Sequence, residues 1–255
     1  MGAAAPARIV ALGASNLTRG FHAVVSTART TWGAEIEIVA ALGHGRSYGA
    51  ESRFLGRTLP GILQSGLWDR LAGMRPARTR AIVSDVGNDI LYGFSPAQIL
   101  SWVEESIERL RLHTDEIVVS GLPKVGVSDI SKAKFLFFRS VLFPRCRLSF
   151  AEVSDAAIAV NEGLRRIATA RRLRFVHLKP EWYGADPIHI RPSHWDDAWQ
   201  EILCGEPVAT VEPSPWGEAW RLYFMRPERQ SVFGVAQVTP QHGAPLPGGG
   251  KVWLY

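Results

Sequence analysis

The hydrophobic positions of this chain follow two alternating patterns over its first two hundred residues. Five short segments are almost continuous in Ile, Val, Leu and Ala, a pattern typical of strands that are buried on both faces of a parallel sheet. They lie at 8–12, 36–41, 80–84, 116–120 and 174–178. Longer segments between them carry apolar residues at helical spacing. These lie at 18–32, 95–112 and 153–171, and the second opens with Ser95-Pro96, a helix cap followed by proline in the first turn.

Strands that alternate with helices predict a parallel sheet covered on both faces, because the connections between parallel strands are right-handed crossovers. We therefore expect an α/β fold in residues 1–204: a three-layer α/β/α sandwich around a five-stranded, flavodoxin-like parallel sheet. Residues 205–255 are richer in Pro and Gly, with strand-like runs at 221–225, 232–238 and 252–255. They predict a small β-rich C-terminal extension that packs on the first domain or on a partner.

Composition narrows the class of protein. With 46% hydrophobic and 21% charged residues, the 255-residue chain can bury a full core and is not a disordered protein. No apolar run approaches the roughly 20 residues of a membrane span, and no charged leader precedes an apolar core, so we expect a cytoplasmic protein. The net charge of +5 comes from scattered basic residues and does not indicate nucleic-acid binding. The two cysteines, Cys146 and Cys204, match no metal-ligand spacing.

Candidate chemistry lies at the ends of three predicted strands. Gly13-Ala14-Ser15 follows the first strand and places the Ser15 hydroxyl at a helix amino terminus, where open α/β sheets bind ligands. Gly87-Asn88-Asp89 follows the third strand, and Asp186-Pro187-Ile188-His189 follows the fifth. A serine becomes a nucleophile when a base takes its proton. His189 is the candidate base, and Asp186 is the candidate acid that orients its ring.

Taken together, these three motifs resemble the signature blocks of the SGNH (GDSL-type) hydrolase family. The resemblance covers roughly residues 8–204. It implies a metal-independent and cofactor-independent serine esterase that forms an acyl-enzyme on Ser15. It also implies an oxyanion hole made by the Ser15 N–H, a glycine N–H of the 43–47 segment and the Asn88 amide. Gly45 fits the family pattern better than Gly43, which stays the alternative.

The sequence also departs from the family pattern. Ala14 stands where the family has an aspartate, so we expect the Ser15 turn to be supported in another way. His194 follows closely and is a rival candidate for the base. We expect a small-molecule ester substrate with a short acyl group, and the extension is a candidate surface for homo-oligomers. Two alternatives remain open: an acyltransferase that passes the acyl group to an alcohol or sugar, and a non-catalytic binding protein on a hydrolase scaffold.

Overall fold

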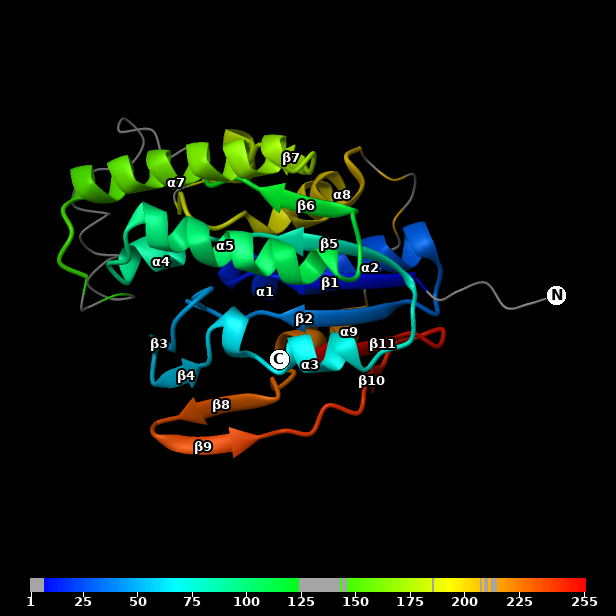
Figure 1. Cartoon of the computed structure of the whole chain (residues 1–255). Helices are drawn as coiled ribbons and strands as arrows, with labels where there is room; N and C mark the ends of the chain where they lie inside the picture. Colours follow the sequence, from blue (N-terminus) through cyan, green and yellow to red (C-terminus); the bar gives the residue numbers. More distant parts are fainter. Residues whose placement is uncertain are drawn as a thin grey trace.

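A seven-stranded sheet forms the centre of the protein, as seen in a computed structural model that describes residues 7–123, 143, 146–184, 186–206, 208, 211 and 215–255 (Figure 1). Its strands run in the order β10-β11-β2-β1-β5-β6-β7. Their bounds are β1 (Ala7–Leu12), β2 (Glu37–Ala41), β5 (Arg78–Val83), β6 (Ile117–Ser120), β7 (Arg174–Val176), β10 (Ala244–Pro245) and β11 (Lys251–Leu254). Only β10 is antiparallel to its neighbour.

Helices cover both faces of this sheet, which confirms the predicted three-layer α/β/α arrangement. Their bounds are α1 (Ser15–Arg19), α2 (Phe21–Trp32), α3 (Leu67–Ala72), α4 (Asn88–Leu91), α5 (Pro96–Arg111), α7 (Phe150–Ala170), α8 (Trp195–Cys204) and α9 (Trp216–Tyr223). Short 3-10 turns are η1 (Ile62–Gln64), η2 (Pro180–Trp182) and η3 (Pro192–His194). Side chains alternate along β1: Ile9 packs with α2 and α8, whereas Val10 packs with α5 and α7.

All five predicted strand segments are present as parallel neighbours, but the sheet is larger than the five strands that we expected. The extension supplies the difference, since β11 pairs with β2 in parallel and β10 pairs with β11. Residue Trp253 of β11 lies opposite Val39 in this register and is 3% exposed. The division into domains at residue 204 stays a prediction.

The helix boundaries follow local signals. Ser95 caps α5 by accepting a hydrogen bond from the Gln98 N–H at 3.3 Å, and Ser149 with Glu152 forms a capping box at α7. The predicted helix at 18–32 is divided into α1 and α2 at Gly20, where Trp199 packs so closely that a Cβ would lie 2.0 Å from its indole nitrogen. Helix α7 begins at Phe150, three residues before the predicted start at residue 153.

Two expectations about local structure are wrong. The run at 232–238 is not one strand, because the turn at Phe233 and Gly234 divides it into the end of β8 (Arg229–Val232) and β9 (Val235–Val238). The run at 221–225 is not a strand, because α9 continues to Tyr223 and buries Glu218 and Leu222 one helical turn apart. A short run rich in aromatic residues is compatible with either a strand or a helix. Here the segment packs against α2, and this contact stabilises the helix.

A second, antiparallel sheet contains the remaining strands in the order β3-β4-β8-β9 (Figure 1). Its strands are β3 (Ser52–Phe54), β4 (Arg57–Leu59), β8 (Arg229–Val232) and β9 (Val235–Val238). Each hairpin turn has two residues with positive φ: Leu55 and Gly56 in the first, Phe233 and Gly234 in the second. The extension therefore contributes strands to both sheets.

Candidate active site

Ser15 is the first residue of α1 and lies directly beyond the carboxyl end of β1. Its side chain is 8% exposed. Gly13 allows the chain to pass close to β5 before this turn, since a Cβ there would lie 2.5 Å from the Ser84 hydroxyl oxygen. The Gly13 N–H donates to the Ala41 carbonyl at 3.1 Å, so the turn is attached to both neighbouring strands.

Ser15, His189 and Asp186 form one hydrogen-bonded chain, although 174 residues separate the first two. The Ser15 Oγ lies 3.1 Å from His189 Nε2, and His189 Nδ1 lies 2.7 Å from Asp186 Oδ2. The other carboxylate oxygen accepts the N–H of Ile188 at 3.0 Å and the N–H of His189 at 3.3 Å. These bonds fix the plane of the carboxylate and the direction of the imidazole ring.

Asp186 is held in its ionised form. Burial acts to raise the pKa of its carboxyl, but the hydrogen bond and charge of His189, together with the two backbone N–H groups, hold that pKa below its ordinary value. Arg19 adds a positive charge with its guanidinium 4.0 Å from the carboxylate. An ionised carboxylate on Nδ1 is the arrangement that directs Nε2 toward a serine as a proton acceptor.

The rival base, His194, has other partners. Its Nε2 lies 2.7 Å from Arg191 Nη2, and its Nδ1 lies 4.0 Å from the Asp197 carboxylate. Both contacts are local to η3 and the start of α8. The structure therefore places His189 and not His194 at Ser15.

Asp85 supports the Ser15 turn, a role that sequence reasoning missed. One carboxylate oxygen of Asp85 accepts the N–H groups of Ala14 and Leu17, both at 2.9 Å. The other accepts the Asn16 side-chain amide, also at 2.9 Å. Asp85 itself adopts φ 57°, a conformation that Asp tolerates better than most residues. A carboxylate from the loop after β5 thus supports the turn at Ala14 and Ser15, where Ala14 has no polar side chain of its own.

Asn16 joins the Ser15 turn to the loop that carries His189. Its Nδ2 donates to the Ile188 carbonyl at 3.1 Å in addition to Asp85, and its Oδ1 accepts the Ile190 N–H at 2.8 Å. The two contacts bracket His189 in the sequence. In the sequence, the signal for this role is an amide side chain directly after the candidate nucleophile.

The candidate oxyanion loop, residues 43–47, lies between β2 and β3. Its turn is closed by the Arg46 N–H donating to the Gly43 carbonyl at 3.1 Å, and Gly45 has φ 67°. The Asn88 amide donates to the Arg46 carbonyl at 3.4 Å, and the Tyr92 hydroxyl donates to the Gly45 carbonyl at 2.7 Å. Asn88 and Gly45 are therefore neighbours. Within the described ranges, the N–H groups of Gly43 and Gly45 both lack an acceptor, so the choice between them stays a prediction.

Two buried charged residues anchor this loop. The Asp89 carboxylate accepts the Ser47 hydroxyl on one oxygen and the Tyr48 N–H at 3.0 Å on the other, and burial raises its pKa to about 6. Arg46 is fully buried. Its guanidinium donates to the backbone oxygens of Pro60 at 3.2 Å, Leu42 at 3.1 Å and Tyr255. The last contact comes from the end of the extension.

His44 gives the extension a second contact with the loop. Its Nε2 lies 3.1 Å from the Tyr223 hydroxyl of α9, and its ring stacks on Phe54 with centroids 5.9 Å apart. Burial, and after it the charges of Arg19 and His189, lower the pKa of His44 to about 4. His44 is therefore neutral at neutral pH and adds no positive charge beside the candidate base.

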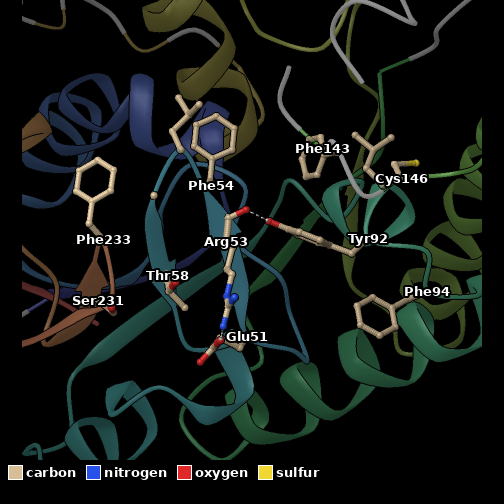
Figure 2. A pocket seen from close by; sticks show the side chains of 14 residues that line it. Glu51, Arg53, Phe54, Thr58, Tyr92, Phe94, Phe143, Cys146, Ser231 and Phe233 are labelled. Carbon is tan, nitrogen blue, oxygen red and sulfur yellow. Dashed lines mark hydrogen bonds and ion pairs between the residues drawn. The ribbon is translucent and has the colours of Figure 1, made fainter. Parts of the chain in front are cut away.

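A cavity of about 860 Å³ adjoins the loop on its Phe54 and Tyr92 side (Figure 2). Its wall combines aromatic rings, among them Phe94, Phe143 and Phe233, with polar side chains such as Glu51 and Arg53. Phe143 packs against both Phe54 and Tyr92, at ring distances of 6.5 Å and 5.2 Å. The cavity is large enough for the body of a small organic molecule.

Neither a metal cluster nor a spanning helix is found in the part of the chain that the structure describes. Among those residues, no three His, Cys, Asp or Glu side chains gather in a way that could hold a metal ion. None of the described helices has the length and apolarity that a bilayer crossing requires.

No protein-family model and no curated protein sequence matches this chain. Solved structures do resemble it. One crystal structure at 13% identity covers 79% of this chain and 97% of its own, with a TM-score of 0.52. A lipolytic protein of the G-D-S-L family from Veillonella parvula (12% identity, 77% and 95% covered, TM-score 0.48) and the psychrotrophic esterase EstA from Pseudoalteromonas sp. (11%, 78% and 95%, 0.48) are similar too. At these identities the likeness to the first structure is one of fold.

Proposed function

We propose that this chain is a serine esterase of the SGNH type, which hydrolyses carboxylic esters through an acyl-enzyme on Ser15. The chain of hydrogen bonds from Ser15 through His189 to Asp186 is the observation that carries the proposal. The fold likeness to SGNH-type structures is consistent with it. Supporting the same proposal, Asn88 and two glycine N–H groups without acceptors among the described residues lie in one loop cluster, and the charge of His189 acts on His44 of that loop.

The chemistry follows from these positions. His189 Nε2 accepts the Ser15 proton while Oγ attacks the ester carbonyl carbon, and the ionised Asp186 stabilises the imidazolium that forms. The carbonyl oxygen becomes an oxyanion, which the Asn88 amide and the loop N–H groups would stabilise. His189 then returns the proton to the departing alcohol oxygen. Water repeats the sequence on the acyl-enzyme, losing its proton to His189 and releasing the acid and Ser15.

Replacement of Ser15 by Ala tests the nucleophile. We expect Ser15→Ala to lower kcat for 4-nitrophenyl acetate by about 10⁴-fold or more, because loss of a triad nucleophile leaves only binding and electrostatic contributions. Ser101→Ala, an exposed helix position, is the matched control. A fluorophosphonate probe should add its mass to the peptide that contains Ser15. Undiminished turnover by the purified Ser15→Ala variant, or labelling of a different serine, would contradict the proposal.

Product analysis separates hydrolysis from the alternative of acyl transfer. The experiment supplies 4-nitrophenyl acetate with and without an added alcohol and measures free acetate against the new ester. Release of acetate in proportion to 4-nitrophenol is expected for an esterase. A dominant new ester at modest alcohol concentration would favour a transferase built on the same acyl-enzyme.

A further inference from the structure

Arg57 extends from the same face of the β3–β4 hairpin as Phe54. The two residues pair directly across the two-residue turn, and paired residues of antiparallel strands project on one face of the ribbon. Phe54 marks where that face points. Its ring stacks on His44, and a Cβ added at Gly45 would lie 3.0 Å from it. Arg57 therefore faces the candidate oxyanion loop.

Arg57 has no partner of its own among the described residues. No carboxylate lies within ion-pair distance of its guanidinium, and its Nε is buried without a hydrogen-bond partner. Two other arginines have carboxylate partners: Arg53 on the neighbouring strand lies 3.5 Å from Glu51, and Arg8 lies 2.6 Å from Glu37. Burying part of a guanidinium without a partner is unfavourable, and proteins pair such groups with anions.

The surroundings of Arg57 are positive. Burial, and then the nearby charge of Arg57, lower the pKa of Arg46 to about 9. His44 experiences the charges of Arg19 and Arg57 together, although burial has the larger effect on its pKa. The hydroxyl of Tyr223 is the polar neighbour that α9 brings to this region. An anion would therefore find attraction here, beside the carbonyl-binding loop.

Resting on the proposed esterase function, we propose that Arg57 binds an anionic group on the substrate, so that the preferred esters carry a carboxylate or a similar oxyanion. A guanidinium forms two parallel N–H···O bonds with such groups and fixes their orientation. Since Arg57 and Phe54 share one face, the bound anion would lie beside Phe54 and the loop that receives the ester carbonyl. The anion would position the ester for attack by Ser15.

Two matched pairs of esters test the proposal and locate the anion. Mono-4-nitrophenyl glutarate against 4-nitrophenyl valerate places the carboxylate on the acyl side, whereas 4-acetoxybenzoate against phenyl acetate places it on the alcohol side. Within each pair, the ratio of kcat/KM for the anionic ester to that for the neutral ester is measured. Because both esters of a pair are measured with the same variant, any effect of the substitution on the triad cancels in this ratio.

We expect the wild-type ratio to exceed one in at least one pair, and Arg57→Met to lower it by roughly tenfold to a hundredfold, the range of a charge-assisted hydrogen bond. Arg57→Lys should recover part of the preference for the anionic ester, because lysine keeps the positive charge but lacks the two parallel N–H donors of the guanidinium. Arg229→Met is the control: Arg229 carries the same charge on β8 of the same sheet, its exposed guanidinium lies 3.6 Å from Glu228, and its loss should leave the ratio unchanged.

The measurements distinguish failure of the anion-site proposal from failure of the esterase proposal. If both ratios are the same in wild type, Arg57→Met and Arg57→Lys, the anion site is wrong even when Ser15 is labelled and turnover is normal. If none of the four esters is hydrolysed and Ser15 is not labelled, the esterase proposal itself fails. Thermal melting of each variant verifies that the measured protein is folded.

Discussion

The two halves of the candidate site are held in place by different parts of the molecule. On the nucleophile side, the Ser15 turn is supported by Asp85 and Asn16, which lie beside the predicted motifs. On the oxyanion side, the 43–47 loop is supported by Arg46 through Tyr255 and by His44 through Tyr223. The partners on the second side come from the last forty residues, about two hundred positions away.

This difference shows that the extension is part of the site's framework. A hydrogen bond of Arg46 to the end of the extension closes the same loop that Asn88 and Tyr92 contact. Strand β11 beside β2 places that backbone oxygen, because β2 leads directly into the loop. The nucleophile half has no contact of this kind in the described part of the chain. Selective variants can therefore weaken one half at a time.

The largest effect is expected on the nucleophile side, from Asp85→Asn. The variant keeps the φ 57° backbone, which Asn also tolerates, but it turns an amide NH₂ toward the Asn16 amide, donor against donor. We expect kcat to fall about 10²-fold with little change in KM, since a displacement of about 1 Å at the reacting atoms has that cost. Asp69→Asn, at an exposed position of α3, is the control.

A second substitution sharpens this test. In Asp85→Asn with Asn16→Asp, the amide of residue 85 donates to the new carboxylate, which still accepts the Ile190 N–H but loses its bond to the Ile188 carbonyl. We expect the pair to recover about tenfold of the lost kcat. If Asp85→Asn has wild-type kcat, the Ser15 turn does not depend on Asp85, and the proposed difference between the two halves is wrong on the nucleophile side.

The nucleophile half of the site could be predicted from the sequence because local patterns encode it. Strand β1 is an apolar run, Ser15 follows it, and the Asp186–His189 spacing places both side chains on one loop. Asp85 lay next to a recognised motif, but its partners at residues 14–17 become visible only when β1 and β5 are paired. The order of strands is a long-range property.

The oxyanion half was harder to predict for a physical reason. Arg46 in the sequence is an ordinary loop arginine, and only the return of β11 to the sheet explains why it is buried. The extension was predicted as β-rich, but the helix α9 that presents Tyr223 was interpreted as a strand. Tertiary packing decided both features, and neither has a local signature.

A smaller effect is expected on the oxyanion side from Arg46→Met. The variant removes three hydrogen bonds to backbone oxygens but leaves the loop attached through Asp89 and Tyr92. Loss of a complete oxyanion donor costs about 10²- to 10³-fold in kcat, so partial displacement of the loop should cost about tenfold. Truncation of the chain after Leu254 removes the Tyr255 oxygen together with the buried Tyr255 ring and its N–H bond to the Ala40 carbonyl, and it should lower kcat in the same direction.

Arg70→Met is the matched control for Arg46. Its guanidinium lies over the Trp253 ring of β11 at 4.7 Å, so it contacts the extension without contacting the loop. We expect it to lower the melting temperature and to leave kcat unchanged. If Arg46→Met also lowers only the melting temperature, with kcat intact well below it, the extension supports the fold and not the loop.

The last contrast between the two halves is in how the stability that each carboxylate contributes depends on pH. We expect it to have the smallest effect on turnover. Asp89 on the oxyanion side has its pKa raised to about 6 by burial, whereas Asp186 on the nucleophile side has its pKa lowered. A raised pKa means that the folded state binds the proton more tightly than the unfolded state. The stability that Asp89 contributes is therefore complete below pH 4 and is lost as the pH rises through about 6.

Asp89→Asn removes this titration and keeps a side chain of the same shape. Its free energy of unfolding relative to wild type should rise by about 2 kcal/mol between pH 4 and pH 6.5 and stay nearly constant above that, whatever its offset at pH 4. Urea unfolding across this range measures the difference. Asp186→Asn should show the opposite sign in urea unfolding extended below pH 4, because the stability from a lowered pKa is present above pH 4 and is lost as the pH falls below it. Equal slopes for the two variants would mean that burial does not distinguish the two carboxylates.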